Sequence, residues 1–332
     1  MNRIDTPRRR FIGIIASTSA LALAPRAIRP AAASAPPASA TWRGIALGAD
    51  AQLRIHHPDP AWSQELIRRA LIETRRLENI FSLYQRDSAL ARLNRDGHLE
   101  NAPGDLLRLL QESQGYSLLT GGAFDPSVQA LWILYTHAAS TGAGLPDEGL
   151  LRQALQCVDH RAIQIQGRDV RLAVPGMALT LNGIAQGYIT DRVTELLRDA
   201  GLEHALVNMG EIRGLNSVPG HRPWRVGLAD DSDARKPLEV IEIRNRAVST
   251  SAGRGTLLDA AGKITHIFDP HGGHATPRYR SVSVEAATAT MADALSTAFS
   301  VMGEEDMRRV AAQTGSSVWI LRKGSDRLDF IG

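Results

Sequence analysis

The chain has 332 residues, of which 43% are hydrophobic and 22% are charged, a composition typical of a globular protein with one large or two small domains. Six arginines and one aspartate lie in residues 1–40, so the overall net charge of +3 leaves about −2 for residues 41–332. This balance excludes a strongly basic nucleic-acid-binding surface. The one cysteine, Cys157, excludes an intramolecular disulfide, and no apolar run after residue 40 is long enough to span a membrane.

The first 40 residues have the layout of an export signal. The stretch RRRFI (residues 8–12) opens an apolar run that ends near Ala24, an order typical of twin-arginine signals. Small residues then offer cleavage sites between about residues 34 and 42. We expect a twin-arginine-type signal peptide and linker over 1–40, a periplasmic protein and one mature domain over 41–332. The alternatives are an ordinary secretory signal or, if cleavage fails, a membrane anchor.

The first half of the body is predicted to be mainly helical. Asp59 and Pro60 form an N-cap and first-turn pair that starts a long helix after a short alternating strand. The predicted elements are a strand over 51–57 and helices over 60–84, 87–94, 103–120 and 146–156. Residues 121–139 are predicted to run from a glycine turn into a helix, with Asp125-Pro126 at the junction.

The second half is predicted to be mainly strands. Two helical patterns interrupt it, one that starts near Ile184 and one over 288–303. The predicted strands cover 162–174 as a hairpin, then 177–181, 204–210, 224–229, 238–251, 264–270 and 280–287, and a helix from Glu304 and two short strands finish the chain. Because helices gather early and strands late, we expect a single α+β domain with a mostly antiparallel sheet flanked by helices.

Asp293 and Thr297 stand out in the apolar helical stretch 288–303, because a buried carboxylate is costly without a partner. Their spacing of four places both oxygens on one helix face, one turn apart. Carboxylate and hydroxyl oxygens suit a hard cation such as Mg²⁺. The alternative is that Asp293 caps the helix while Thr297 bonds back to a carbonyl.

Two glycine-containing turns are candidate ligand-binding segments. LNGIAQGY (residues 181–188) joins a strand to a helix start, where exposed amides attract phosphate. GGAFDPSV (residues 121–128) lets the backbone approach a ligand closely. The alternatives are a plain strand-to-helix turn for the first, and for the second an N-cap at Asp125 with Pro126 at the first helical position.

Two later segments carry polar side chains. THIFDPHGGHA (residues 265–275) contains three histidines, but its glycines break any helix and its spacing does not match a zinc motif. We expect a loop in which His266 and Asp269 flank a ligand. STSAG (residues 249–253) lacks the pattern of a nucleophile elbow and is interpreted as a strand end whose hydroxyls bind a polar group.

Taken in order, these stretches resemble the successive motifs of the ApbE family, the FAD:protein FMN transferases. The resemblance covers about residues 42–325 and rests on motif order, since each motif alone is weak. The stretch 42–51 and the leader are also similar to exported, NosX-type members associated with nitrous oxide respiration. The motifs are FSLYQRDSALARLN, GGAFDPSV, LNGIAQGYITDRV, VNMGEIRG, AVSTSAG, THIFDPHGG and MADALSTAFSVMG.

The resemblance implies a reaction and a site. FMN would move from FAD to a Ser or Thr hydroxyl of a target protein, with release of AMP; the target would be a membrane-anchored FMN-binding redox subunit. Mg²⁺ would be held by Asp293, Thr297 and the main-chain carbonyl of Ala185, and Asp293 is also a candidate base. The residues implied to contact FAD are Leu47, Tyr84, Ala123, Phe124, Asp125, Asn182, Asp191 and His266.

The chain departs from the family pattern at four places. Leu47-Gly48-Ala49 replaces Met-Gly-Thr, Gln186 replaces a Lys, Glu211 replaces a Gly, and Ala252 replaces a Gly. No implied metal ligand is lost, so we expect transferase activity. The rival interpretations are an exported accessory protein that binds or hydrolyses FAD without an acceptor, and a non-catalytic assembly factor.

Overall fold

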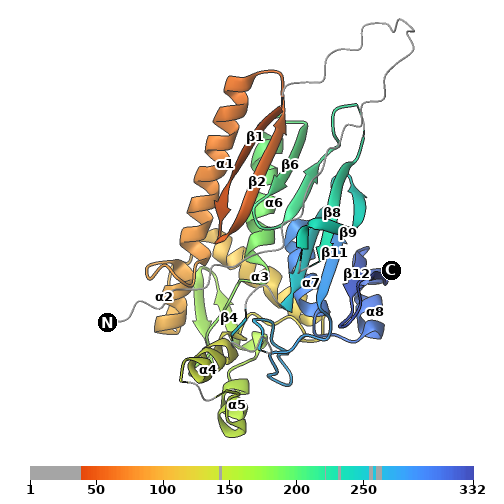
Figure 1. The fold of residues 1–332 in the computed structure, drawn as a ribbon. Coiled ribbons are helices and arrows are strands. Elements are labelled where there is room, and N and C mark those ends of the chain that lie inside the picture. Colours follow the sequence, from red (N-terminus) through yellow and green to blue (C-terminus); the bar gives the residue numbers. More distant parts are fainter. Residues whose placement is uncertain (1–38, 142–143, 221, 231–232, 254–256, 259–263) are drawn as a thin grey trace, which may run out of the picture.

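The computed structural model describes residues 39–141, 144–220, 222–230, 233–253, 257–258 and 264–332 (Figure 1). Its centre is an eight-stranded sheet in which every neighbouring pair is antiparallel. This confirms the predicted α+β class with a mostly antiparallel sheet. In spatial order the strands are β1 (Ser39–Ala46), β2 (Ala49–His56), β6 (His204–Asn208), β7 (Ile212–Leu215), β10 (Ala247–Ala252), β11 (Ser281–Ala286), β12 (Ser317–Leu321) and β13 (Leu328–Phe330).

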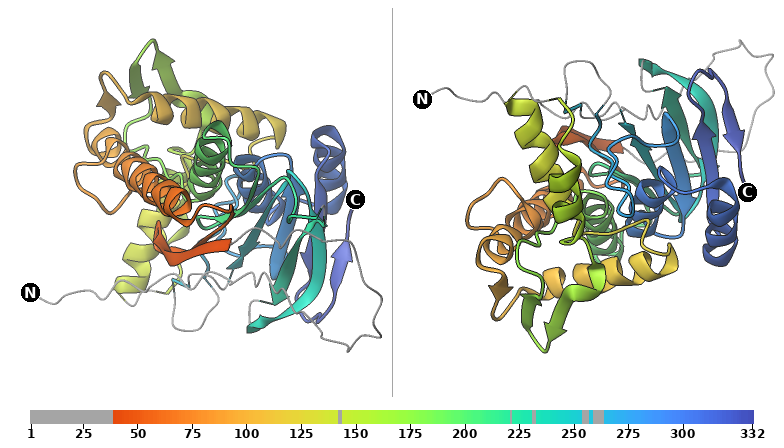
Figure 2. Two further views of the ribbon diagram at one scale, coloured as in Figure 1. Left: turned by 90° about the horizontal axis from the view of Figure 1, so that it is seen from above. Right: turned by 90° about the horizontal axis from the view of Figure 1, so that it is seen from below.

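Three helices cover one face of this sheet (Figure 2). They are α1 (Pro60–Phe81) over β1 and β2, α6 (Ala185–Asp199) over β6 and β7, and α7 (Ala289–Phe299) over β10 and β11. Helix α6 contacts both of the others, so it lies between them. Near the chain end, α8 (Glu304–Thr314) buries Met307 and Val310 in the same core.

The opposite face of the sheet is covered by the hairpin of β8 (Trp224–Asp230) and β9 (Asp233–Ile243). Alternation along β6 explains how one strand serves both faces. Ala205 and Val207 point into the core beneath the helices, whereas Leu206 packs with Trp224 and Ile243 of the hairpin. Two cores therefore sandwich the middle of the sheet.

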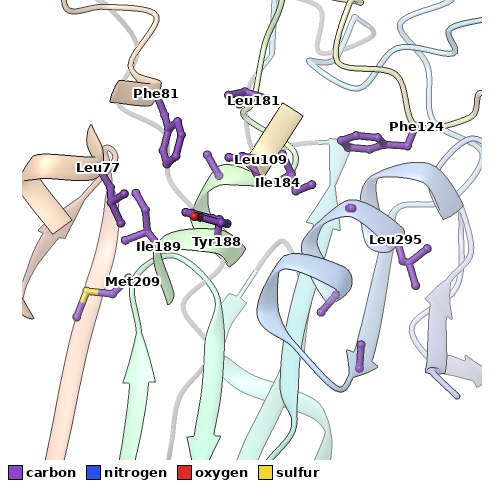
Figure 3. Packing of buried hydrophobic residues seen from close by; sticks show 14 of the residues in the cluster. Leu77, Phe81, Leu109, Phe124, Leu181, Ile184, Tyr188, Ile189, Met209 and Leu295 are labelled. Carbon is purple, nitrogen blue, oxygen red and sulfur yellow. The ribbon is translucent and has the colours of Figure 1, made fainter. Parts of the chain in front are cut away.

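The core beneath the helices fixes how α1 and α6 pack. The ring centroids of Phe81 and Tyr188 lie 5.6 Å apart with the rings nearly perpendicular, a favourable edge contact. Figure 3 shows these rings among the side chains of Leu77 and Ile189. The Tyr188 hydroxyl donates to Asp105 at 2.8 Å, so the polar end of this buried ring is satisfied.

A smaller group of elements lies beside the sheet and carries one wall of the site. It contains the three-stranded sheet β3-β5-β4 and the helices that flank it. The bounds are α2 (Ala89–Asp96), β3 (His98–Leu99), α3 (Gly104–Leu119), α4 (Gln129–Ser140), α5 (Glu148–Leu155), the 3₁₀ turn His160–Ala162, β4 (Ile163–Gln166) and β5 (Asp169–Leu172). Leu131 and Tyr135 of α4 pack against Ile264 and Phe268, so α4 supports the loop 264–275.

The predicted helix starts are confirmed where a capping residue marks them. Asp59 Oδ1 accepts the amides of Ala61 at 2.8 Å and Trp62 at 3.1 Å, with Pro60 at the first helical position of α1. Asp147 caps α5 in the same way. Both helices therefore start where the sequence places them.

Several predictions of strands were wrong or incomplete. Residues 264–270 form a loop with one isolated bridge, Leu257 to Thr265. Residues 238–251 form parts of two strands, because Asn245 adopts a left-handed φ of 52° that ends the extended run. The predicted strand over 177–181 is wrong, because that segment has only an isolated bridge from Ala178 to Val128, and strands β1, β3 and β7 were not predicted.

The predicted leader over 1–40 lies almost wholly outside the described residues, which begin at Ser39. Among the helices that the structure describes, none combines the length and apolarity needed to cross a membrane.

Candidate active site

A cavity brings together most of the predicted site residues. Its walls are the turn 123–129, the strand-to-helix turn 180–186, the end of β10, the loop 266–270 and α7. The predicted residues that line it are Ala123, Phe124, Asp125, Asn182, His266, Asp293 and Thr297. Segments separated by more than 150 residues of sequence therefore converge on one site.

Asp293 is buried in α7 and points at the start of α6. It is 4% exposed, and its Oδ2 accepts the amide of Gly187 at 2.9 Å. The cap of α7 is instead Thr288, whose side chain accepts the amide of Met291. The capping alternative for Asp293 is therefore wrong. A first-turn amide of α6 holds the carboxylate, an arrangement that the helix dipole favours.

Two glycines allow the turn before α6 to lie directly against α7. A Cβ atom on Gly183 would lie 2.8 Å from Thr297 Oγ1, and one on Gly187 would lie 2.2 Å from the carbonyl oxygen of Ala289. Ala185 stands between these two glycines as the first residue of α6. The turn that carries the predicted carbonyl ligand is thus held against both predicted side-chain ligands.

A group of hydroxyls joins β10 to α7. Ser251 Oγ lies 2.8 Å from Ser296 Oγ and 3.4 Å from Thr297 Oγ1. Ser251 and its neighbours Thr250 and Ala252 line the cavity. These hydroxyls therefore lie at the cavity, and their binding to a polar group stays a prediction.

The cavity wall is acidic. Asp125, Glu211 and Asp293 line it, and none of its lining residues in the described part of the chain is Lys or Arg. Burial and the nearby charge of Asp293 raise the pKa of Glu211 well above its ordinary value, although Ser249 and the Thr250 amide hydrogen-bond to it. An anionic ligand would be repelled here unless a cation bound with it.

Asp125 holds the turn 121–128 in place. Its Oδ1 accepts from the amide and hydroxyl of Ser127 at 2.8 and 2.5 Å, and its Oδ2 accepts the amide of His160 at 2.9 Å. Helix α4 begins later, at Gln129. The N-cap alternative for Asp125 is therefore wrong, because the side chain ties the turn to the 3₁₀ turn at His160.

Three of the residues implied to contact FAD do not line the cavity. Leu47 lies in the β1–β2 turn with a φ of 47° and donates its amide to Glu78 Oε1. Tyr84, just beyond α1, is 69% exposed. Asp191 is buried in α6 and accepts from Arg213 and from the first two residues of α7. Asp191 therefore links α6 to α7 and to Arg213, and does not form part of the cavity wall.

Among the lining residues that were not predicted as site residues, two pairs stand out. Gln186 and Glu211 appeared only as departures from the family pattern, yet both are almost fully buried in the wall. Trp132 and Phe268 form an aromatic wall, with ring centroids 6.3 Å apart at 76°. In the sequence, Gln186 and Glu211 could have been noticed as polar residues inside family motifs. Trp132 and Phe268 look like ordinary core residues there.

The loop 264–275 closes over the glycine turn. His271 Nε2 lies 3.1 Å from the carbonyl oxygen of Gly121, and the Asp269 carboxylate accepts the amide of His271 at 3.0 Å. His266 lines the cavity, whereas Asp269, which was predicted to flank the ligand with it, is not among the lining residues. In the described part of the chain, no group of three or more His, Cys, Asp or Glu side chains is placed to hold a metal. Any metal here would need hydroxyl, carbonyl or water ligands as well.

Known proteins similar to this chain share its fold and much of its length. The ApbE family model matches residues 47–320. The FAD:protein FMN transferase of Treponema pallidum (strain Nichols) is 32% identical over 260 residues, which cover 69% of this chain and 72% of that protein. The FAD:protein FMN transferase of Vibrio cholerae is 30% identical, over 74% of this chain and 75% of that protein.

The solved structures agree. The flavin transferase ApbE from Vibrio cholerae superposes with a TM-score of 0.74 at 25% identity, over 89% of this chain and 97% of that one. The ApbE protein from Thermotoga maritima gives a TM-score of 0.76 at 25% identity, over 88% of this chain and 97% of that one. The chain belongs to the ApbE family.

Proposed function

We propose that this protein is a Mg²⁺-dependent FAD:protein FMN transferase. It would move FMN from FAD to a Ser or Thr hydroxyl of a target redox protein and release AMP. The observation that carries the proposal is the acidic cavity in which Asp293, Thr297 and the turn 183–187 meet, with no Lys or Arg among its described lining residues. The names of the relatives support the same activity.

The oxygen donors of the site fit Mg²⁺. The carboxylate of Asp293, the hydroxyl of Thr297 and the carbonyl of Ala185 are hard ligands, and Mg²⁺ usually completes its octahedron with water and substrate phosphates. When bound, the ion would act as a Lewis acid that neutralises charge on the pyrophosphate oxygens. The closeness of Gly183 to Thr297 and of Gly187 to Asp293 fixes these donors before substrate arrives.

The rest of the cavity suits the ring systems of FAD. Phe124, Trp132 and Phe268 offer apolar and aromatic surface on one side. Asn182 and His266 add polar groups that can orient a ring by hydrogen bonds. A cavity lined by aromatic rings and by carboxylates suits a ligand whose flat rings are joined by a pyrophosphate that binds with a cation.

The transfer forms one phosphoester bond and breaks one anhydride bond. The acceptor oxygen attacks the FMN phosphorus, the bond to the AMP oxygen breaks, and the proton of the hydroxyl needs an acceptor. We propose Asp293 for this role as well, because it is the cavity carboxylate that the α6 amide already positions. The acceptor hydroxyl is provided by the partner protein.

The test is to incubate the purified chain with FAD, MgCl₂ and a domain of a candidate acceptor protein. Covalent FMN on the acceptor with an equal amount of AMP is the expected result. Free FMN and AMP with no labelled acceptor would indicate a hydrolase, and unchanged FAD would indicate a binding protein. Either of these outcomes, obtained with every candidate acceptor, contradicts the proposed transfer.

We further propose that the protein acts in the periplasm after twin-arginine export. Its target would be a membrane-anchored FMN-binding subunit, to be sought first among proteins of nitrous oxide respiration. The support is the RRRFI stretch followed by a short apolar run, and the resemblance of residues 42–51 to exported members. Changing Arg8 and Arg9 together to Lys should keep the protein in the cytoplasm. Normal periplasmic levels of this variant would contradict the proposed route.

A further inference from the structure

Glu211 is the most heavily buried carboxylate of the cavity wall. It is 3% exposed and follows Gly210 in the turn between β6 and β7, which delivers it to the same cavity as Asp293. The segments that carry the two carboxylates meet at the start of α6: Gly210 lies against Gln186, and Asp293 accepts the amide of the next residue, Gly187. Two charged carboxylates in one buried site are unfavourable, so the arrangement is costly unless a proton or a cation compensates it.

The arginine nearest to Glu211 in sequence does not compensate it. Arg213 donates to Asp191 at 2.5 Å on the other side of the α6–α7 contact, and it does not line the cavity. The partners of the Glu211 side chain are neutral, the Ser249 hydroxyl and the Thr250 amide. Neither these partners nor Arg213 therefore offsets the charge that Glu211 carries when it is deprotonated.

Gln186 gives an independent indication of a ligand beside Glu211. It is 2% exposed, it lines the cavity, and its Nε2 has no hydrogen-bond partner among the described residues. Its side chain lies against Gly210, where a Cβ atom would approach within 2.8 Å of it, and Gly210 itself has a φ of 109°. This contact keeps the amide in the wall, and a buried amide donor without a partner is costly.

We propose that Glu211 and Gln186 extend the cation site: Glu211 supplies a second carboxylate beside Asp293 to the divalent cation, and Gln186 Nε2 donates to an oxygen of the phosphate group bound with it. The proposal rests on the proposed function for the presence of a cation at Asp293. One divalent ion would offset the charges of the Glu211 and Asp293 carboxylates. One phosphate oxygen would accept a hydrogen bond from Gln186 Nε2.

Cation binding tests Glu211 without any need for turnover. Mn²⁺ is titrated into the metal-free full chain and followed by electron paramagnetic resonance. We expect Glu211→Gln to weaken Mn²⁺ binding about tenfold or more, since affinity follows the charge of the ligand set. Glu305→Gln is the matched control, because Glu305 is exposed at the start of α8, outside the cavity, and it should leave Mn²⁺ affinity unchanged.

The unfolding temperature separates coordination from a structural role. In metal-free protein the Glu211→Gln variant should be at least as stable as the unsubstituted chain, because one of two facing carboxylates is gone. The rise in unfolding temperature that Mn²⁺ produces should shrink at the same time. A lower unfolding temperature of the metal-free variant with an unchanged Mn²⁺ affinity would overturn the role of Glu211.

Gln186→Met tests the amide, because it keeps a similar length and removes the donor. Binding of Mn²⁺ alone should stay unchanged, whereas ADP, used as a pyrophosphate probe in the presence of Mn²⁺, should bind about tenfold more weakly. Equal ADP affinity in the variant and the unsubstituted chain would overturn the role of Gln186.

The Asp293→Asn variant separates this proposal from the function on which it rests. If Asp293→Asn binds Mn²⁺ normally, the metal site of the proposed function is wrong. If Asp293→Asn loses Mn²⁺ while Glu211→Gln keeps full affinity, only the extension to Glu211 is wrong. Loss of affinity in both variants supports both.

Discussion

The contact between α6 and α7 contains two buried carboxylates in opposite circumstances. Asp191 is surrounded by donors: Arg213, the amides of Ala289 and Thr290, and the Thr290 hydroxyl. Asp293, one turn further along α7, lines a cavity with another acid and no described Lys or Arg. Burial alone therefore does not mark a functional carboxylate. A carboxylate that pairs with an arginine holds the fold, whereas one that lines a cavity together with another acid is a candidate for the proposed cation site.

The largest expected effect is the loss of FMN transfer when Asp293 is replaced. Asp293→Ala should lower FMN transfer by about 1,000-fold or more, because it removes a charged ligand from the proposed metal site. The folded state should persist, because the hydrogen bond that Asp293 accepts from the Gly187 amide is lost, and a single such bond contributes about 1 kcal/mol. Far-ultraviolet circular dichroism checks the fold, and acceptor labelling measures the rate. Undiminished transfer would show that Asp293 is not needed for catalysis.

Replacement of Asp191 should mainly lower the stability of the fold. Asp191→Ala should lower the free energy of unfolding by about 3–5 kcal/mol, because it leaves Arg213, whose side chain is 15% exposed, without its partner. Urea denaturation of the two alanine variants measures the difference. Equal stability of the Asp191 and Asp293 variants would show that the two sites do not differ as described.

The helix contact that carries both acids can be loosened with a single methyl group. Gly187→Ala should cost about 1–3 kcal/mol and reduce transfer, because the new Cβ would meet the carbonyl of Ala289 at 2.2 Å. Gly115→Ala is the control: it lies in α3 with nothing within 4 Å of its added Cβ, and should stabilise the protein by about 0.5–1 kcal/mol. A Gly187→Ala variant that matched this control would contradict the close approach of the helices.

The smallest effect concerns a titratable group far from the cavity. Burial lowers the pKa of His56, as do Arg54 and His204, which is its partner across β2 and β6. Because the unfolded chain then binds more protons, stability should fall as the pH drops from 7.5 through about 6.5 toward the lowered pKa. His56→Gln should flatten this dependence by about 1 °C in unfolding temperature. An identical pH profile for the variant would contradict this assignment.

The sequence predicted best those features that depend on residues only a few positions apart. The four-residue step from Asp293 to Thr297 predicts a shared helix face, and the glycines of 181–188 predict a tight turn before a helix, as the structure confirms. Capping pairs such as Asp59-Pro60 placed helix starts equally well. These signals need only a few neighbouring residues, so they survive without knowledge of the tertiary fold.

The sequence was least informative where a residue's role depends on a distant partner. Asp191 and Asp293 look alike in sequence; the donors around Asp191, Arg213 among them, and the cavity beside Asp293 separate them. Glu211 reaches the cavity through the β6–β7 turn, and Trp132 meets Phe268 across more than 130 residues. The loop 264–270 has a strand-like composition, but its contacts are with α4 and the cavity. Such contacts follow from the fold, not from local pattern.

The most direct measurement is the mass of a candidate acceptor after incubation with the unsubstituted protein and FAD, once with excess Mg²⁺ and once with EDTA. The account predicts that the acceptor gains one FMN less one water only with Mg²⁺, and that AMP appears in equal amount. Equal labelling in EDTA, or AMP released without labelling of any acceptor, would contradict a cation-dependent transfer at Asp293.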